Sequence, residues 1–178
     1  GAPFDSYLTL RGVRTLFPRM RQHLENAEHV VAALGAHPAV AALHYPGLAS
    51  HPGHAIAASQ QSGFGAMVSF ELHGGAAAAE DFVSDLRCFT LAESLGGVES
   101  LIAHPATMTH ASMDADARRT AGIGDSLLRL SIGIEHPADL VADLVAALDR
   151  VGDAARPRAS SRDVAVFVTD ALHEATVA

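Results

Sequence analysis

A long run of apolar residues at helical spacing constrains the fold of this chain more than any other feature of its sequence. Between Ser6 and Leu34 the apolar residues recur three or four positions apart, which is typical of one face of an amphipathic helix. The positions are Leu10, Val13, Leu16 or Phe17, Met20, Leu24, Ala27, Val31 and Leu34. Asp5 or Ser6 can cap the start of this helix, and Gly35 can end it. We therefore predict a single helix over 6–34.

The predicted helix is longer than one small domain needs. At 1.5 Å per residue it would span on the order of 45 Å, so we expect it to bridge to another part of the protein. Bulky apolar residues near its start, among them Phe4, Tyr7 and Phe17, should then be uncovered in this chain by itself. Pro18 cannot donate a hydrogen bond to the carbonyl of Arg14, and it should kink the helix near that turn.

Shorter patterns follow along the rest of the chain. They predict strands over 40–45, 65–72 and 127–134, and helices over 54–61, 75–86 and 137–151. The segment 89–110 has weak periodicity and many glycines, prolines and polar residues, so we interpret it as an irregular, functional loop. Together the elements predict an α/β fold of the two-layer α+β type, with a sheet backed by helices on one side. We assign residues 1–151 to this domain and treat 152–178 as a linker-like appendage with a short strand and a helix.

The composition argues against several classes of protein. The hydrophobic fraction is 49%, but charges interrupt it so often that no run approaches the roughly 18 to 20 apolar residues of a membrane span. The net charge of -8, with no basic stripe, disfavours a nucleic-acid partner, because such a partner needs a positive surface to neutralise its phosphates. The N-terminus resembles no signal peptide, and the single cysteine, Cys88, has the apolar neighbours of a small core residue. We therefore expect a cytoplasmic protein with no membrane segment.

Lysine is absent from the sequence, since all 12 basic residues are arginine. Lysine is the residue that forms Schiff bases with carbonyl cofactors such as pyridoxal phosphate (PLP). This polypeptide therefore cannot by itself tether such a cofactor through an internal lysine.

The 11 histidines suggest a metal site. His51 and His54 have a spacing that could ligate zinc, and His104 and His110 are further candidate ligands. No cysteine or acidic cluster completes this set convincingly, so we expect no metal centre.

A family resemblance is carried by four stretches of the chain, which in order are DSYLTLRGVRTL, HYPGLASHPGHAIAASQQSGFGAMVSFEL, FTLAESLGGVESLIAHPATMTHASM and GIGDSLLRLSIGIE. Together they resemble the C-terminal region of the cystathionine gamma-synthase and gamma-lyase family, the Cys/Met-metabolism group of PLP enzymes. The resemblance covers residues 4 to about 150. It implies the C-terminal domain of an enzyme with the aspartate-aminotransferase type of fold (fold type I). The large N-terminal domain that binds most of the PLP in such enzymes would be missing from this chain.

The resemblance also implies the site residues. Arg129 matches the arginine that receives the α-carboxylate of the substrate, a task that suits arginine because its planar fork can donate two parallel hydrogen bonds. Ser94 is expected to help place that carboxylate and the lysine amine of the large domain, and so to contact the cofactor. Glu93 is expected near the distal end of the substrate. Thr109 matches a residue that lines the same pocket.

The function implied is that of a part of a PLP-dependent carbon-sulfur lyase or gamma-synthase of sulfur amino acid metabolism, with cysteine, cystathionine or homocysteine as the small-molecule substrate. The implied partners are the missing N-terminal domain and further copies of the chain, since the family forms homotetramers. By itself the chain should be inactive. Two alternatives stay open: a cysteine-type lyase domain embedded in a multidomain protein resembling a polyketide synthase, and a non-catalytic interaction or assembly module. The wording AESLGG does not distinguish lyase from synthase.

Overall fold

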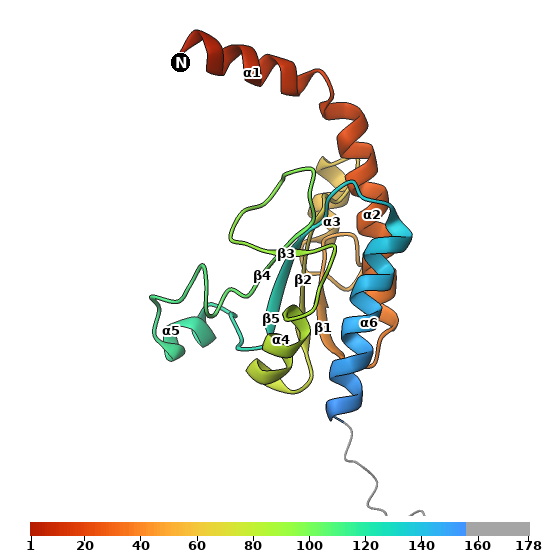
Figure 1. The fold of residues 1–178 in the computed structure, drawn as a ribbon, viewed down its shortest axis with the longest axis vertical. Coiled ribbons are helices and arrows are strands. Elements are labelled where there is room, and N and C mark those ends of the chain that lie inside the picture. The colour runs from red at the N-terminus through yellow and green to blue at the C-terminus, as the bar shows by residue number, and fades with distance from the viewer. Residues whose placement is uncertain (156–178) are drawn as a thin grey trace, which may run out of the picture.

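The computed structural model of the protein describes residues 1–155 (Figure 1). Its helices are α1 (Pro3–Val13), α2 (Leu16–Ala36), α3 (His54–Gln60), α4 (Gly75–Val83), α5 (Ala115–Thr120) and α6 (Pro137–Ala155). Its strands are β1 (Val40–His44), β2 (Met67–Leu72), β3 (Thr90–Leu91), β4 (Leu101–Ala103) and β5 (Leu127–Ser131). None of the helices in this range is long and apolar enough to span a bilayer.

The strands form one sheet in the order β1-β2-β5-β4-β3. Neighbouring strands are antiparallel except β3 and β4, which run parallel. Side chains alternate between the two faces of a strand, and the buried residues Val68 and Phe70 of β2 and Leu128 and Leu130 of β5 all belong to one core. Helices α2, α4 and α6 pack over this core on one face of the sheet (Figure 1). The predicted two-layer α/β fold is therefore confirmed.

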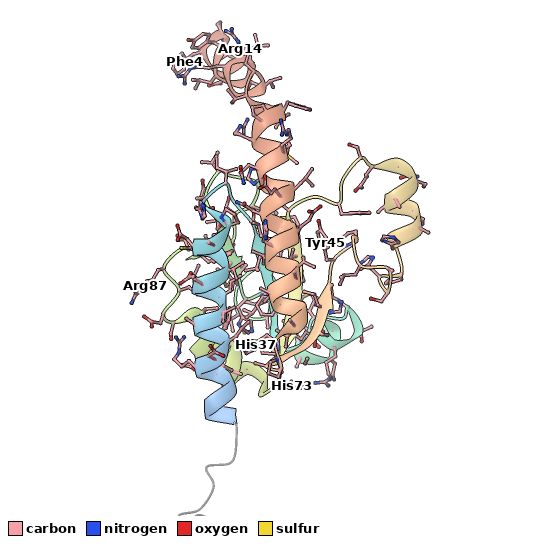
Figure 2. All side chains as sticks on the ribbon, turned by 90° about the vertical axis from the view of Figure 1, so that its right-hand side faces the viewer. Phe4, Arg14, His37, Tyr45, His73 and Arg87 are labelled. Atoms are coloured by element: carbon pink, nitrogen blue, oxygen red, sulfur yellow. The ribbon has the colours of Figure 1, made fainter. Side chains whose placement is uncertain are left out.

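The helical layer is built from two amphipathic helices that lie side by side, α2 and α6 (Figure 2). Their fully or almost fully buried apolar positions are Ala27, Val30 and Leu34 on α2 and Leu140, Leu144, Ala147, Leu148 and Val151 on α6. The spacing of three or four residues brings these side chains onto one stripe of each helix. Burying one of the valine or leucine side chains contributes about 1.5–3 kcal/mol, so this layer is a rigid support for the sheet.

The single helix predicted over 6–34 is wrong in one respect, because α1 and α2 are separate helices with a turn at Arg14 and Thr15 between them. Pro18 gives the physical reason. Its nitrogen has no hydrogen to donate to the carbonyl of Arg14, and its place in the first turn of α2 requires none. The predicted kink is thus a full break at the expected turn.

Helix α1 projects away from the rest of the fold, with Phe4 and Arg14 on the projecting part (Figures 1 and 2). It buries none of its residues. Phe4 is 68% exposed, and Phe17, at the start of α2, is 75% exposed. Further apolar residues exposed in this region are Tyr7, Leu8, Leu10, Val13, Leu16 and Met20. The predicted uncovered apolar surface is therefore present, and surfaces of this kind normally mark an interface.

Four other elements differ from the predictions. The segment 89–110 contains strands β3 and β4, which at two and three residues are too short for periodicity to reveal. Helix α5 was not expected, because its six residues bury no side chain and leave no apolar stripe. Helix α6 continues past the predicted end at Val151. The strand and helix predicted near the end of the chain fall outside the described residues, so the assignment of 152–178 stays a prediction.

Candidate functional site

Arg129 lies in the middle of β5, on the face of the sheet opposite to the layer of α2 and α6. Its neighbours Leu128 and Leu130 are fully buried in the core, so the pleat of the strand directs Arg129 to the other face. There it lies opposite Ser69 of β2 and Ala103 of β4, both small residues. A half-buried arginine is thus held on a rigid strand between two small neighbours.

The guanidinium of Arg129 is only partly used by the protein. Its Nη2 donates to the backbone carbonyl of Glu93 at 3.1 Å and, more weakly, to that of Ser94 at 3.4 Å. Its Nε is buried and has no hydrogen-bond partner within residues 1–155. A buried N–H of a charged group without an acceptor is costly. An added carboxylate that reached the guanidinium would therefore bind favourably.

The connection from β3 to β4, residues 92–100, brings the other predicted residues to Arg129. Both Glu93 and Ser94 lie in this loop, and both are exposed. They contact Arg129 through their backbone carbonyls rather than through their side chains. The structure therefore brings three of the four predicted substrate residues together, with Glu93 and Ser94 exposed.

Ser131 is a residue of this site that neither the sequence pattern nor the family resemblance indicated. Its hydroxyl accepts a hydrogen bond of 2.8 Å from the N–H of Gly96, at the middle of loop 92–100. Gly96 has a φ of 77°, a left-handed conformation that favours glycine. The signal that could have found Ser131 is its place two residues after Arg129, because alternate residues of a strand share a face.

Thr109 is positioned separately. Its hydroxyl hydrogen-bonds to Nδ1 of His110 at 2.8 Å, and within residues 1–155 no hydrogen bond joins it to Arg129 or to loop 92–100. The segment that carries it is shaped by His104, which is almost fully buried. His104 Nε2 lies 2.9 Å from the carbonyl of Asp125, so this nitrogen is the donor. The role of Thr109 in the pocket stays a prediction.

The histidines considered as metal ligands have structural roles instead. Nδ1 of His51 accepts a hydrogen bond from the N–H of Gly53 at 3.1 Å, and Nδ1 of His54 lies 2.8 Å from the carbonyl of Pro46. Across the part of the chain that the structure describes, no group of three or more His, Cys, Asp or Glu side chains is arranged to hold a metal. Nothing in this region therefore supports a metal centre.

Cys88 is also structural in character. It is half-buried against the hydrophobic core, and its N–H donates to the carboxylate of Asp143 at 2.8 Å. Burial, with a contribution from the negative charge of Asp143, raises the pKa of the Cys88 thiol. A raised pKa lowers the fraction of reactive thiolate, so this thiol is poorly suited to act as a nucleophile.

The residues of the site do not suffice to hold PLP. The sequence contains no lysine to tether the cofactor, and the described site offers one guanidinium, two backbone carbonyls and a few hydroxyl groups. Of these groups, the guanidinium fits a carboxylate ligand. Any tether for PLP must come from another polypeptide segment.

Comparison with known proteins adds to this geometry. The family described as Cys/Met metabolism PLP-dependent enzyme matches residues 1–149. Cystathionine gamma-synthase of Escherichia coli K12 is 57% identical over 144 residues, which are 81% of this chain and 37% of that protein. Cystathionine beta-lyase of Lactococcus lactis subsp. cremoris is 52% identical over 148 residues, which are 83% of this chain and 39% of that protein. The chain therefore spans about two fifths of the length of these relatives.

A solved structure extends the comparison to three dimensions. Cystathionine gamma-synthase from Xanthomonas oryzae pv. oryzae, in complex with cystathionine, is similar with a TM-score of 0.82 and 63% sequence identity. The match covers 86% of this chain and 40% of that one. It confirms the predicted fold type, and with the match over residues 1–149 it confirms the resemblance. The chain belongs to the Cys/Met metabolism family of PLP-dependent enzymes.

Proposed function

We propose that this chain is the substrate-binding part of a PLP-dependent enzyme that forms or cleaves carbon-sulfur bonds in cystathionine-type amino acids. The observation that carries the proposal is the incompletely used guanidinium of Arg129, on the face of the sheet opposite to α2 and α6. A carboxylate is the ligand that matches such a fork. The solved relative in complex with cystathionine supports a substrate of this class.

In the proposed site each residue of the chain has a binding or orienting role. Arg129 binds the α-carboxylate and so fixes the α-carbon of the substrate, while the carbonyls of loop 92–100 fix the guanidinium. Ser94 helps to place the carboxylate and the incoming lysine amine, Glu93 lies near the distal end of the substrate, and Thr109 lines the pocket. PLP, when bound, supplies the electron sink that labilises bonds at the α-carbon.

The proposal requires a further polypeptide segment that carries PLP and its lysine. The exposed apolar residues of α1 and of the start of α2, with Phe4 and Phe17 as the bulkiest, form the surface on which we place this segment. The chain by itself should be inactive. The assembled enzyme should be a homo-oligomer, with the tetramer of the family as the expected form.

A chimeric enzyme tests the proposal. The segment of the Xanthomonas oryzae enzyme that matches this chain is replaced by residues 1–149, and the purified chimera is supplied with PLP. Cystathionine is offered as substrate, and the products are identified by mass spectrometry. Cleavage on the three-carbon side of the sulfur releases homocysteine, pyruvate and ammonia, whereas cleavage on the four-carbon side releases cysteine, 2-oxobutyrate and ammonia. In a parallel assay with cysteine and a homoserine ester, formation of cystathionine identifies a synthase.

The chain by itself is the matched control. Mixed with PLP, it should yield no imine that borohydride traps on an internal side chain, because it has no lysine. Turnover by the chimera supports the proposal, and the products show which bond is formed or cleaved. A folded, PLP-loaded chimera without any of these activities would contradict it and favour a non-catalytic module.

A further inference from the structure

The far end of loop 92–100 is held by a carboxylate that the proposed reaction does not itself use. Glu135, in the turn between β5 and α6, accepts two hydrogen bonds from Ser100. The N–H of Ser100 donates to Oε1 at 2.7 Å, and its hydroxyl donates to Oε2 at 2.8 Å. The Ser100 hydroxyl also accepts from the N–H of Gly133 at 2.8 Å. Ser100 is fully buried and Glu135 is half-buried, so this end of the loop is fixed by charge-assisted bonds to a residue inside the fold.

The turn that carries Glu135 is itself fixed to the helical layer. Asn26 of α2 is fully buried, and its Nδ2 donates to the carbonyl of Glu135 at 2.8 Å and to that of Gly133 at 3.0 Å. His23, one turn earlier on α2, places Nδ1 2.6 Å from the carbonyl of Ile132. Buried hydrogen bonds of this kind rigidify the backbone to which they are made. Glu135 thus links loop 92–100 to a turn that is itself hydrogen-bonded to α2.

The two ends of the loop are held differently. At its start the carbonyls of Glu93 and Ser94 are held by Arg129, the residue that the substrate would engage. At its end Ser100 is held by Glu135, which makes no hydrogen bond to Arg129 in the described residues. The attachment through Glu135 does not involve Arg129, so it stays in place when Arg129 turns its donors to a ligand. Two single hydrogen bonds remain with it, from the N–H of Gly96 to the Ser131 hydroxyl at 2.8 Å and from the N–H of Ile134 to the carbonyl of Val98 at 2.9 Å, but neither involves a charged group.

From this arrangement we infer that Glu135 is a positioning residue, which acts through Ser100 to hold Glu93, Ser94 and the guanidinium of Arg129 in the geometry that binds substrate. The inference rests on the proposed function of Arg129. In this role Glu135 touches neither substrate nor cofactor. It sets the fraction of molecules in which loop 92–100 has the binding-competent arrangement.

This role has a kinetic consequence that a purely structural role would not have. When only a fraction of the molecules has the competent loop, the apparent affinity for substrate falls by that fraction, whereas saturating substrate selects the competent form. Loss of the anchor therefore raises KM and largely spares kcat. A residue needed only for folding would instead reduce the number of active molecules, lowering kcat at an unchanged KM.

The test compares Glu135→Ala, Glu135→Gln and the control Glu80→Gln, whose carboxylate lies exposed on α4, in the chimera described above. Glu135→Ala should raise KM for cystathionine about tenfold and change kcat by less than about twofold. Glu135→Gln retains one acceptor for the N–H of Ser100, so it should raise KM only about threefold. The control should match the parent chimera.

A second measurement uses the 178-residue chain itself and does not depend on activity. Hydrogen exchange, read by mass spectrometry, should be faster in loop 92–100 of both Glu135 variants than in the parent and in Glu80→Gln, with α6 unchanged. An active chimera whose Glu135 variants keep the parent KM, or lose only kcat, would overturn the positioning role alone, as would unchanged exchange in the loop. An inactive parent chimera would overturn the proposed function, and the positioning role with it.

Discussion

Replacement of Arg129 gives the most direct prediction about this chain. The guanidinium donates through Nη2 to the carbonyls of Glu93 and Ser94, and its remaining N–H groups are those assigned to the substrate carboxylate. Arg129→Ala removes the whole fork. Loss of a charge-assisted bidentate contact costs about 2–4 kcal/mol of transition-state stabilisation, which is about a 30- to 1000-fold loss in kcat/KM.

Arg129→Lys separates charge from geometry. The ammonium keeps one positive charge on the strand, but it cannot hold the two loop carbonyls and both carboxylate oxygens in one plane. We expect its kcat/KM to stay about ten- to a hundredfold below that of the parent. A variant that recovered fully with lysine would show that the site needs a charge and not a fork.

Steady-state kinetics of the chimera with cystathionine provide the measurement. Arg150→Lys is a suitable control, because Arg150 lies on α6 and pairs with Asp81 and Asp85, on the helical side of the sheet. Circular dichroism and the bound PLP content establish that each variant is folded and loaded. A near-normal kcat/KM for Arg129→Ala would refute the assignment of the α-carboxylate to this residue.

The remaining predictions concern the chain by itself. The chain should self-associate through the exposed apolar surface at α1, and sedimentation velocity should show less association for the double variant Phe4→Ser, Phe17→Ser. A parent chain that sediments as a monomer would contradict the interface. Asn26→Ala leaves the buried carbonyl of Gly133 and the half-buried carbonyl of Glu135 without their donor, and it should lower the free energy of unfolding by about 2–4 kcal/mol in urea titrations. A loss below about 0.5 kcal/mol would show that the turn is not anchored there. Cys88 should react with iodoacetamide more slowly than a free cysteine at about pH 8, and its rate should increase as the pH rises toward its raised pKa. Asp143→Asn should accelerate the reaction, because it removes a negative charge that raises this pKa. A rate equal to that of free cysteine would contradict the raised pKa.

Much of the fold could be read from periodicity, because periodicity records which side of an element faces the core. The pattern from Leu140 to Val151 predicted α6, and the alternation before Leu72 predicted β2. Pro18 marked the turn at which the first helix breaks, although the sequence suggested a kink rather than two helices. Strands β3 and β4 escaped prediction because elements of two or three residues contain no repeat.

The sequence likewise indicated several residues of the site but not the contacts between them. Residue chemistry and family resemblance singled out Arg129, Glu93 and Ser94, but neither indicated that backbone carbonyls of the loop would hold the guanidinium. Thr109 was singled out by the same resemblance, and its place in the pocket stays a prediction. Ser131 could have been noticed from its shared strand face with Arg129.

By itself the sequence determined the local properties: where chain segments are amphipathic, that no lysine is available to tether PLP, and that an arginine lies on a strand between two leucines. Only the tertiary structure decided which distant groups meet. Glu135 reaches Ser100 across 35 positions, and Arg129 reaches the carbonyl of Glu93 across 36, because β5 lies beside β4 in the sheet. The physical reason is that burial leaves a repeating trace in the sequence, whereas a hydrogen bond between two loops depends on strand order and on backbone groups that every residue carries.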